Sequence, residues 1–227
     1  MMYKSGMLRI HAFIMGVILY VFAFLPGPVF AVPLEEIINN VQRTYRETED
    51  LTADFIQEST LKSLNKTQTA TGKIYYKNQG KLRWDYKGTT KQKIVTDGET
   101  LWMYLPEDNQ VIINQLSKVY QSNTSAFFLS EMGDLKKDFD IQLVGATPGD
   151  EDKGYQLKLI PREQQSSFDE IFLWVDKINF LVVETYFYDF YGNLIRIKFR
   201  NHRVNNGLPD SMFVFTVPKD AEVIEAQ

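Results

Sequence analysis

Apolar and polar side chains alternate along most of the chain after residue 50, and this alternation decides which folds are open to it. In the segment 82–86, for example, Leu, Trp and Tyr alternate with Arg and Asp. A period of two places the apolar side chains on one face of a β-strand. Such segments recur about every ten residues, between turn residues such as Asn78-Gln79-Gly80 and Asp97-Gly98. They predict strands at residues 53–58, 73–77, 82–86, 101–105, 111–116, 139–144, 155–160, 171–175, 181–188, 194–199 and 213–217.

The regular spacing and short links predict one large antiparallel meander in a mainly β fold. A long open meander exposes two hydrogen-bonding edges, so we expect it to curl into a barrel or to split into a sandwich. No linker or change of composition divides the sequence after residue 31. We therefore predict a single domain over residues 32–227.

Two segments have helical periodicity instead. After Pro33, apolar residues three or four positions apart form one stripe, which consists of Leu34, Ile37, Ile38, Val41 and Tyr45. Between Ser122 and Lys137 the alternation stops, and helical spacing appears at Ala126, Phe127, Leu129 and Met132. We expect two amphipathic helices, each of which needs an apolar partner.

The dipeptide Asp97-Gly98 predicts a two-residue hairpin turn across which Ile94 pairs with Leu101. Residues paired across antiparallel strands face the same side of the sheet. The pairing therefore assigns Ile94, Leu101 and Met103 to one face, and Val95, Trp102 and Tyr104 to the other. Because both faces are partly apolar, two interpretations remain open. One is a sandwich with a filled core, and the other is a curved sheet whose concave face, capped by the two helices, leaves a cavity for an apolar ligand.

The first 31 residues are predicted to be a cleavable secretory signal peptide. Lys4 and Arg9 precede an apolar run over residues 12–25, which is shorter than the roughly twenty residues needed to span a bilayer. A Pro-Gly-Pro segment ends the run, and Ala31 supplies a small residue where a signal peptidase cleaves. The mature chain would then begin at Val32. An uncleaved N-terminal anchor is the alternative.

The composition argues against catalysis and against metal binding. The chain has no cysteine and two histidines, of which only His202 lies outside the predicted signal peptide. Thiolate metal sites, cysteine nucleophiles and multi-histidine sites are therefore excluded, and no hydrolase, metalloprotease or phosphate-loop motif occurs. We expect no catalytic residues, no metal and no cofactor, and we interpret His202 as a surface side chain among cations. A net charge of -4 argues against nucleic-acid binding, which needs a basic face.

Several motifs coincide in the first half of the chain. They are Leu51-x-Ala53-x-Phe55-x-Gln57, Leu82-Arg83-Trp84-Asp85-Tyr86, Ile94-Val95-x-Asp97-Gly98-x-x-Leu101-Trp102-x-Tyr104-x-Pro106 and Asn109-Gln110-Val111. Their order and spacing resemble the outer-membrane lipoprotein carrier family, LolA. The later half matches in strand rhythm, and Phe213-x-Phe215-x-Val217-Pro218 resembles the closing strand of that family. Many members carry a basic residue and Pro at the turn before the Trp strand, whereas this chain has Asn78-Gln79-Gly80.

The resemblance implies a mainly β fold with some α, an incomplete (half-open) antiparallel β-barrel capped by a helical lid over an apolar cavity. It implies a periplasmic carrier that binds acyl chains of lipoproteins and takes them from an inner-membrane lipoprotein-releasing ABC transporter to an outer-membrane lipoprotein receptor or to the outer membrane itself. We expect the carrier to be a monomer. A related periplasmic lipid-binding or lipoprotein-sensing module of the same fold is the alternative.

The resemblance also indicates where the ligand binds. Trp84 and Ile94 match cavity positions of the family, and residues 127–129 fall where its second, lid-forming helix lies. The expected cavity residues are Phe55, Ile74, Tyr76, Leu82, Trp84, Ile94, Leu101 and Met103. The expected lid residues are Ile38, Val41, Phe127, Phe128 and Leu129.

Overall fold

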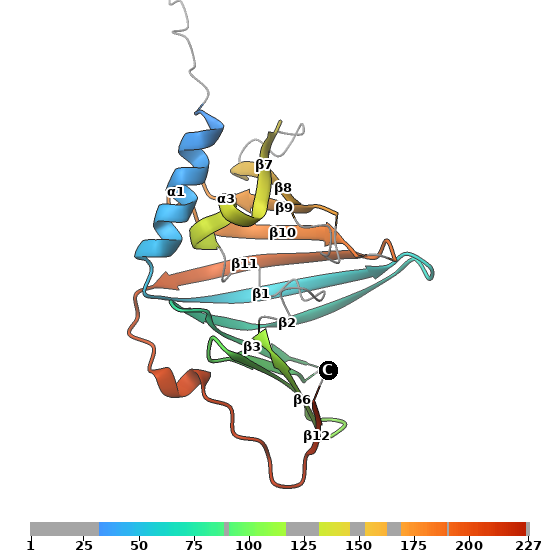
Figure 1. Cartoon of the computed structure of the whole chain (residues 1–227). Helices are drawn as coiled ribbons and strands as arrows, with labels where there is room; N and C mark the ends of the chain where they lie inside the picture. Colours follow the sequence, from blue (N-terminus) through green and yellow to red (C-terminus); the bar gives the residue numbers. More distant parts are fainter. Residues whose placement is uncertain are drawn as a thin grey trace, which may run out of the picture. The chain divides into compact units, whose positions relative to one another are not determined.

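The computed structural model describes residues 32–88, 91–116, 132–145, 153–162, 169–189 and 191–225, all within one compact unit, Val32–Gln227. The predicted signal peptide and the expected lid residues Phe127, Phe128 and Leu129 lie outside the described residues. The described chain is mainly β with few helices, as predicted (Figure 1). The strands are β1 (Asp50–Leu61), β2 (Lys66–Lys77), β3 (Lys81–Lys87), β4 (Lys93–Thr96), β5 (Thr100–Leu105), β6 (Gln110–Gln115), β7 (Phe139–Val144), β8 (Tyr155–Pro161), β9 (Ile171–Val175), β10 (Val182–Tyr188), β11 (Leu194–Val204) and β12 (Glu222–Glu225).

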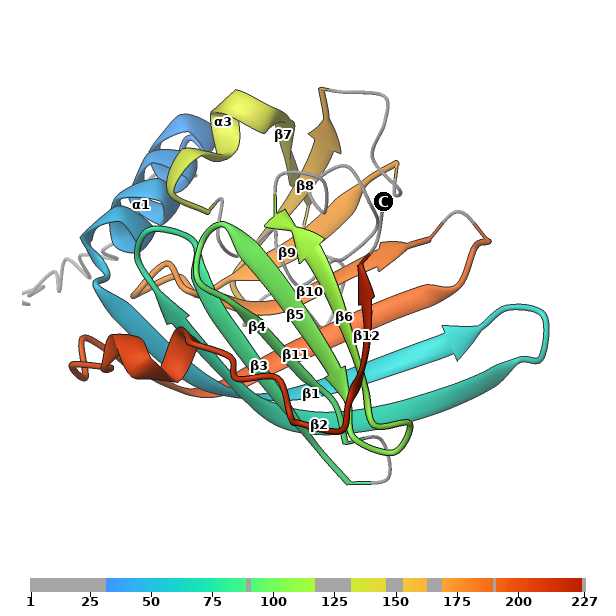
Figure 2. The ribbon, with the colours of Figure 1, turned by 60° about the horizontal axis from the view of Figure 1, so that its bottom comes forward.

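All of these strands form one sheet with the order β12-β6-β5-β4-β3-β2-β1-β11-β10-β9-β8-β7. Strands β1–β6 form one antiparallel meander and β7–β11 form a second, and the two are joined where β1 pairs with β11. The short β12 adds to β6 in parallel. Figure 2 shows that the sheet is strongly curled, while its end strands, β12 and β7, are not paired with each other. The structure therefore confirms the open antiparallel sheet, and the strands do not divide into the two packed sheets of a sandwich.

The first helix forms where the apolar stripe predicts it. Helix α1 (Leu34–Glu47) buries Ile37, Val41 and Tyr45, while its first turn carries two glutamates that complement the helix dipole. At its end, Thr48 donates from both its backbone N–H and its hydroxyl to the carbonyl of Thr44. Of the second predicted helix, the structure describes only the short α3 (Leu135–Asp138) and the turn before it.

The register predicted for the Asp97-Gly98 hairpin is wrong by two residues. Ile94 pairs with Met103, not with Leu101, because the Asp97 carboxylate accepts the backbone N–H groups of both Glu99 and Thr100 and draws them into the turn. A shift of two residues preserves the side on which each residue lies. The predicted faces are therefore correct although the predicted partners are not.

The strand predicted at residues 213–217 is also wrong. Residues 210–213 form a short 3-10 helix, η2 (Asp210–Phe213), and the following residues run across the outer face of the sheet without pairing (Figure 2). Phe213 is 1% exposed, and the ring of Phe215 stacks on that of Trp102 with centroids 6.3 Å apart. The alternating phenylalanines thus cover the outer apolar face, and the edge position is taken by β12.

The C-terminal segment, residues 205–221, is anchored at the start of β1 by a buried carboxylate. Asp50 is 2% exposed, and its two oxygens accept the backbone N–H groups of Asn206, Gly207 and Leu208 at 2.7, 2.8 and 3.0 Å. Burial opposes ionisation of this carboxyl, but the three N–H donors outweigh it and hold its pKa below the ordinary value.

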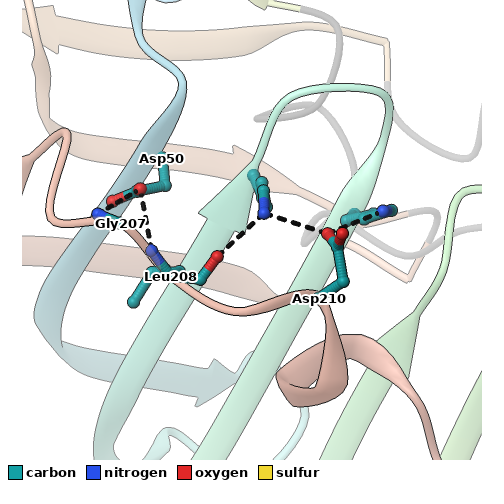
Figure 3. Close-up of polar contacts among 6 residues, drawn as sticks. Asp50, Gly207, Leu208 and Asp210 are labelled. Carbon is teal, nitrogen blue, oxygen red and sulfur yellow. Dashed lines mark hydrogen bonds and ion pairs between the residues drawn. The ribbon is translucent and has the colours of Figure 1, made fainter.

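Two lysines, at the end of β2 and at the start of β3, hold the next part of the C-terminal segment, and Figure 3 shows these polar contacts beside those of Asp50. Lys77 donates to the carbonyl of Leu208 at 2.8 Å, and both Lys77 and Lys81 lie 2.9 Å from the carboxylate of Asp210. The hydrogen bonds from these lysines lower the pKa of Asp210 to about 2. Asp50 and Asp210 therefore hold the segment at two successive points.

We predict that Asp50→Asn lowers the free energy of unfolding by about 2 kcal/mol at neutral pH, because an amide cannot accept three charge-assisted hydrogen bonds. The pKa of Asp50 is lower when folded than its ordinary value of about 4. The contribution of the carboxylate is therefore complete above that value and is lost as the pH falls through the folded-state pKa. Urea midpoints of the two proteins, measured from neutral pH to about pH 2, should converge at the acid end. Since the other carboxylates are common to both, a difference that does not change with pH would contradict this role of Asp50.

Candidate functional site

The inner face of the curled sheet shares one apolar cluster with α1. Residues of β1–β5 and β7–β11 contribute to it, and the helix contributes Ile37, Val41 and Tyr45. The cluster crosses the junction between the two meanders without interruption, so the two halves of the sheet form one continuous apolar surface. Its strand residues include Leu51, Ala53, Phe55, Ile74, Tyr76, Leu82, Trp84, Ile94, Leu101, Leu157, Leu159, Ile171, Leu173, Ile197 and Phe199.

Four aromatic rings occupy the centre of this face. The ring of Phe55 packs edge-on against those of Trp84 and Tyr86, with centroids 4.7 and 4.8 Å apart, and Trp84 lies 6.0 Å from Phe199 on β11. Gly72, opposite Phe55 on β2, leaves room for this arrangement, because a Cβ there would lie 2.5 Å from the Phe55 ring. The cluster thus depends on a glycine in the middle of a strand.

Helix α1 is tied to the sheet through Tyr45. The Tyr45 hydroxyl accepts the backbone N–H of Val182 at 3.1 Å, and its ring packs edge-on against Tyr76. Burial raises the pKa of the Tyr45 phenol, so the group stays neutral. Next to it, the exposed hydroxyl of Thr44 donates to the carbonyl of Asn179 at 3.2 Å.

A second set of contacts ties α1 to α3. The side-chain oxygen of Gln42 accepts the backbone N–H of Lys136 at 3.1 Å, and the ammonium group of Lys136 pairs with Glu35. The same ammonium group donates to Asn39 at 3.1 Å. The helix therefore covers the inner face by apolar packing and is held by the buried hydrogen bond of Tyr45 and by polar contacts to α3.

The inner face becomes more polar along β1. Its residues Leu51, Ala53 and Phe55 are buried, whereas Gln57 and Ser59, which continue the same alternation, are polar and half-buried. The Tyr86 hydroxyl donates to the Gln57 side chain at 2.9 Å, and Gln57 donates in turn to Ser59 at 3.2 Å. Burial raises the pKa of Tyr86. A polar row therefore borders the aromatic rings.

The structure brings the expected cavity residues together on this face. Phe55, Ile74, Tyr76, Leu82, Trp84, Ile94 and Leu101 are buried members of the cluster, and Met103 packs against it half-buried. Of the expected lid residues, Val41 belongs to the cluster, while Ile38 is 2% exposed but lies outside it. The residues that line the second half of the face, such as Phe199 and Ile197 on β11, were not among the expected site residues. The alternation within 194–199 was visible in the sequence, but the sequence did not show that these residues lie on the inner face.

Two further features are a pocket on the outer side of the sheet and the side chain of His202. A shallow pocket of about 540 Å³ opens at the far end of β1. Its lining residues Thr60 and Leu194 alternate with inner-face neighbours, so the pocket lies on the outer side. His202 is half-buried rather than fully at the surface, with Nε2 3.1 Å from the carbonyl oxygen of Val182, and burial lowers its pKa.

Two kinds of feature are absent from the described part of the chain. Residues 32–88, 91–116, 132–145, 153–162, 169–189 and 191–225 contain no group of three or more His, Asp or Glu side chains arranged to hold a metal ion. In the same ranges, no helix has the length and apolar character needed to cross a membrane.

Comparison with known proteins identifies relatives along most of the chain. The family model "Outer membrane lipoprotein carrier protein LolA" matches residues 46–216. Proteins named outer-membrane lipoprotein carrier protein are 28% identical over 187 residues in Methylobacillus flagellatus (82% of this chain, 88% of that protein) and 30% identical over 175 residues in Methylococcus capsulatus (77% and 81%). In fold, the chain is similar to an uncharacterized conserved protein from Thermus thermophilus, with a TM-score of 0.53 at 19% identity, over 85% of this chain and 98% of that one.

We predict that Tyr45→Phe lowers the free energy of unfolding by about 1–3 kcal/mol, because it leaves the buried N–H of Val182 without its acceptor. Amide hydrogen exchange in α1 should become faster than exchange in the central strands, since the variant releases the helix before it unfolds the sheet. Thr44→Val is the control on the same helix. It removes an exposed hydrogen bond and should change the stability by less than about 0.5 kcal/mol. Unchanged exchange in α1 would show that Tyr45 does not hold the helix on the sheet.

Proposed function

Since the chain belongs to the outer-membrane lipoprotein carrier family LolA, we propose that it is a periplasmic carrier that binds the acyl chains of lipoproteins against the inner face of its sheet. The observation that carries this proposal is the continuous apolar cluster between an open, curled sheet and the amphipathic helix α1. Displacement of α1 would expose this surface to the cargo. The expected cavity residues, Trp84 and Ile94 among them, would then contact the acyl chains.

The energetics suit a reversible carrier. Burial of an acyl chain contributes about 0.8 kcal/mol per methylene, so a chain of about sixteen carbons gains on the order of 12 kcal/mol before any cost. In the closed structure Ile37, Val41 and Tyr45 occupy the same surface. Cargo must displace these side chains, and this competition lowers the net affinity so that release remains feasible.

We further propose the route that the family implies. The chain would be exported by cleavage of residues 1–31, with residues 32–227 acting as one carrier domain in the periplasm. It would receive acylated lipoproteins from the inner-membrane releasing transporter and deliver them to a receptor on the outer membrane or to that membrane itself. Binding alone explains this role, and the inner face carries apolar groups and hydrogen-bond donors suited to holding a lipid.

The carrier function is testable with two adjacent isoleucines on β6. Ile112 pairs with Met103 on the inner face, and Ile113 pairs with Trp102 on the outer face. Both are half-buried. We predict that Ile112→Glu reduces acceptance of a triacylated lipoprotein from inner-membrane vesicles about tenfold or more, because a carboxylate must lose its hydration where an alkyl chain is bound. The matched variant Ile113→Glu should accept cargo within about threefold of the wild type.

The urea midpoints of both variants are measured alongside acceptance. Similar midpoints with a selective loss of acceptance in Ile112→Glu support the inner face as the binding surface. Equal acceptance by the two variants would contradict this assignment of the binding surface. A wild-type protein that binds no acylated protein at all would contradict it as well.

A further inference from the structure

Among the residues that the structure describes, two buried side-chain hydrogen-bond donors in the sheet have no acceptor. They are the indole N–H of Trp84 and the hydroxyl of Thr185, and both side chains are 0% exposed. Within the part of the chain that the structure describes, the third buried side-chain polar atom without a hydrogen bond is Nε of Arg196, which has a carboxylate oxygen of Glu184 at 3.4 Å. Buried polar groups are nearly always paired, so the donors of Trp84 and Thr185 need an explanation.

Both donors belong to the inner face. Trp84 pairs with Ile74 and Ile94, and Thr185 pairs with Ile197 and Leu173. All four of these partners are members of the apolar cluster. Since paired residues share a face, the indole and the hydroxyl both lie on the surface that α1 covers.

The two donors flank the junction of the two meanders. The ring of Trp84 lies 6.0 Å from that of Phe199 on β11, and Thr185 pairs with Ile197, two residues earlier on the same strand and face. The row formed by Tyr86, Gln57 and Ser59 lies beside Trp84, where the face changes from apolar to polar. At such a boundary, the apolar chain of a bound lipid would end and its polar acyl linkage would begin.

We propose that Trp84 Nε1 and Thr185 Oγ1 donate hydrogen bonds to the carbonyl oxygens of acyl linkages, so that the inner face selects acyl lipids over lipids with plain alkyl chains. The inference rests on the proposed carrier function and adds the chemical group that is recognised. Neither donor finds an acceptor among the described residues, and each would gain one with an acyl lipid, whereas an alkyl ether offers no carbonyl. The difference therefore favours acyl binding by about threefold to tenfold for each hydrogen bond.

The test compares two phospholipids with the same head group and chain length, one with two ester-linked chains and one with two ether-linked chains. Each is used to displace a fluorescent apolar dye from residues 32–227 in the same detergent. Wild type should prefer the diester by at least about threefold. Thr185→Val keeps the shape of the side chain, removes the unpaired hydroxyl and should reduce this preference while maintaining or raising the urea midpoint. Thr185→Ser retains a hydroxyl and should restore the preference.

Trp84→Phe is the second variant and removes the indole N–H while keeping an aromatic ring. Its diester-to-diether ratio should also fall, and the ratio of the double variant with Thr185→Val should approach one. Equal displacement by the two lipids in wild type would overturn the inference while leaving the carrier function intact. So would an unchanged ratio in folded Thr185→Val and Trp84→Phe proteins. Failure of both lipids to displace the dye from wild type would instead count against the carrier function itself.

Discussion

The antiparallel pairing of β1 with β11 is the contact on which the rest of the structure depends. It joins a meander from the first half of the chain to one from the second half, so that their inner faces become a single apolar surface. Through it, Phe199 on β11 comes within 6.0 Å of Trp84 on β3. Without this pairing, each meander would carry a half-exposed apolar face of its own.

The two faces of the sheet are covered in different ways. On the outer side, the C-terminal segment (residues 205–221) is held by the carboxylates of Asp50 and Asp210 and packs Phe213 and Phe215 against the strands. On the inner side, α1 is held by apolar packing and by polar contacts such as that of Tyr45 with Val182. Charge-assisted contacts hold the C-terminal segment on the outer face. A helix that is held mostly by apolar contacts, as α1 is, can be displaced by another apolar molecule. This difference suits the proposed carrier function, in which cargo would displace α1 from the inner face.

Local chemistry determined much of this protein from the sequence alone. Alternation along 82–86 and 194–199 specified strands, and the stripe from Ile37 to Tyr45 specified a helix, because side-chain periodicity reflects backbone geometry within a single element. The motifs around Trp84 also identified the family and most of one half of the apolar face.

Only the tertiary structure decided how the elements meet. That β1 pairs with β11, that residues 213–217 pack on the outer face instead of forming a strand, and that Trp84 and Thr185 share one surface all depend on contacts between residues far apart in the chain. The Asp97-Gly98 hairpin shows the same division on a small scale. Its faces followed from parity, but its register depended on which N–H groups the Asp97 carboxylate accepts. Periodicity determines the face of the sheet on which a residue lies. The residue with which it pairs on the neighbouring strand depends on the free energy of the assembled sheet.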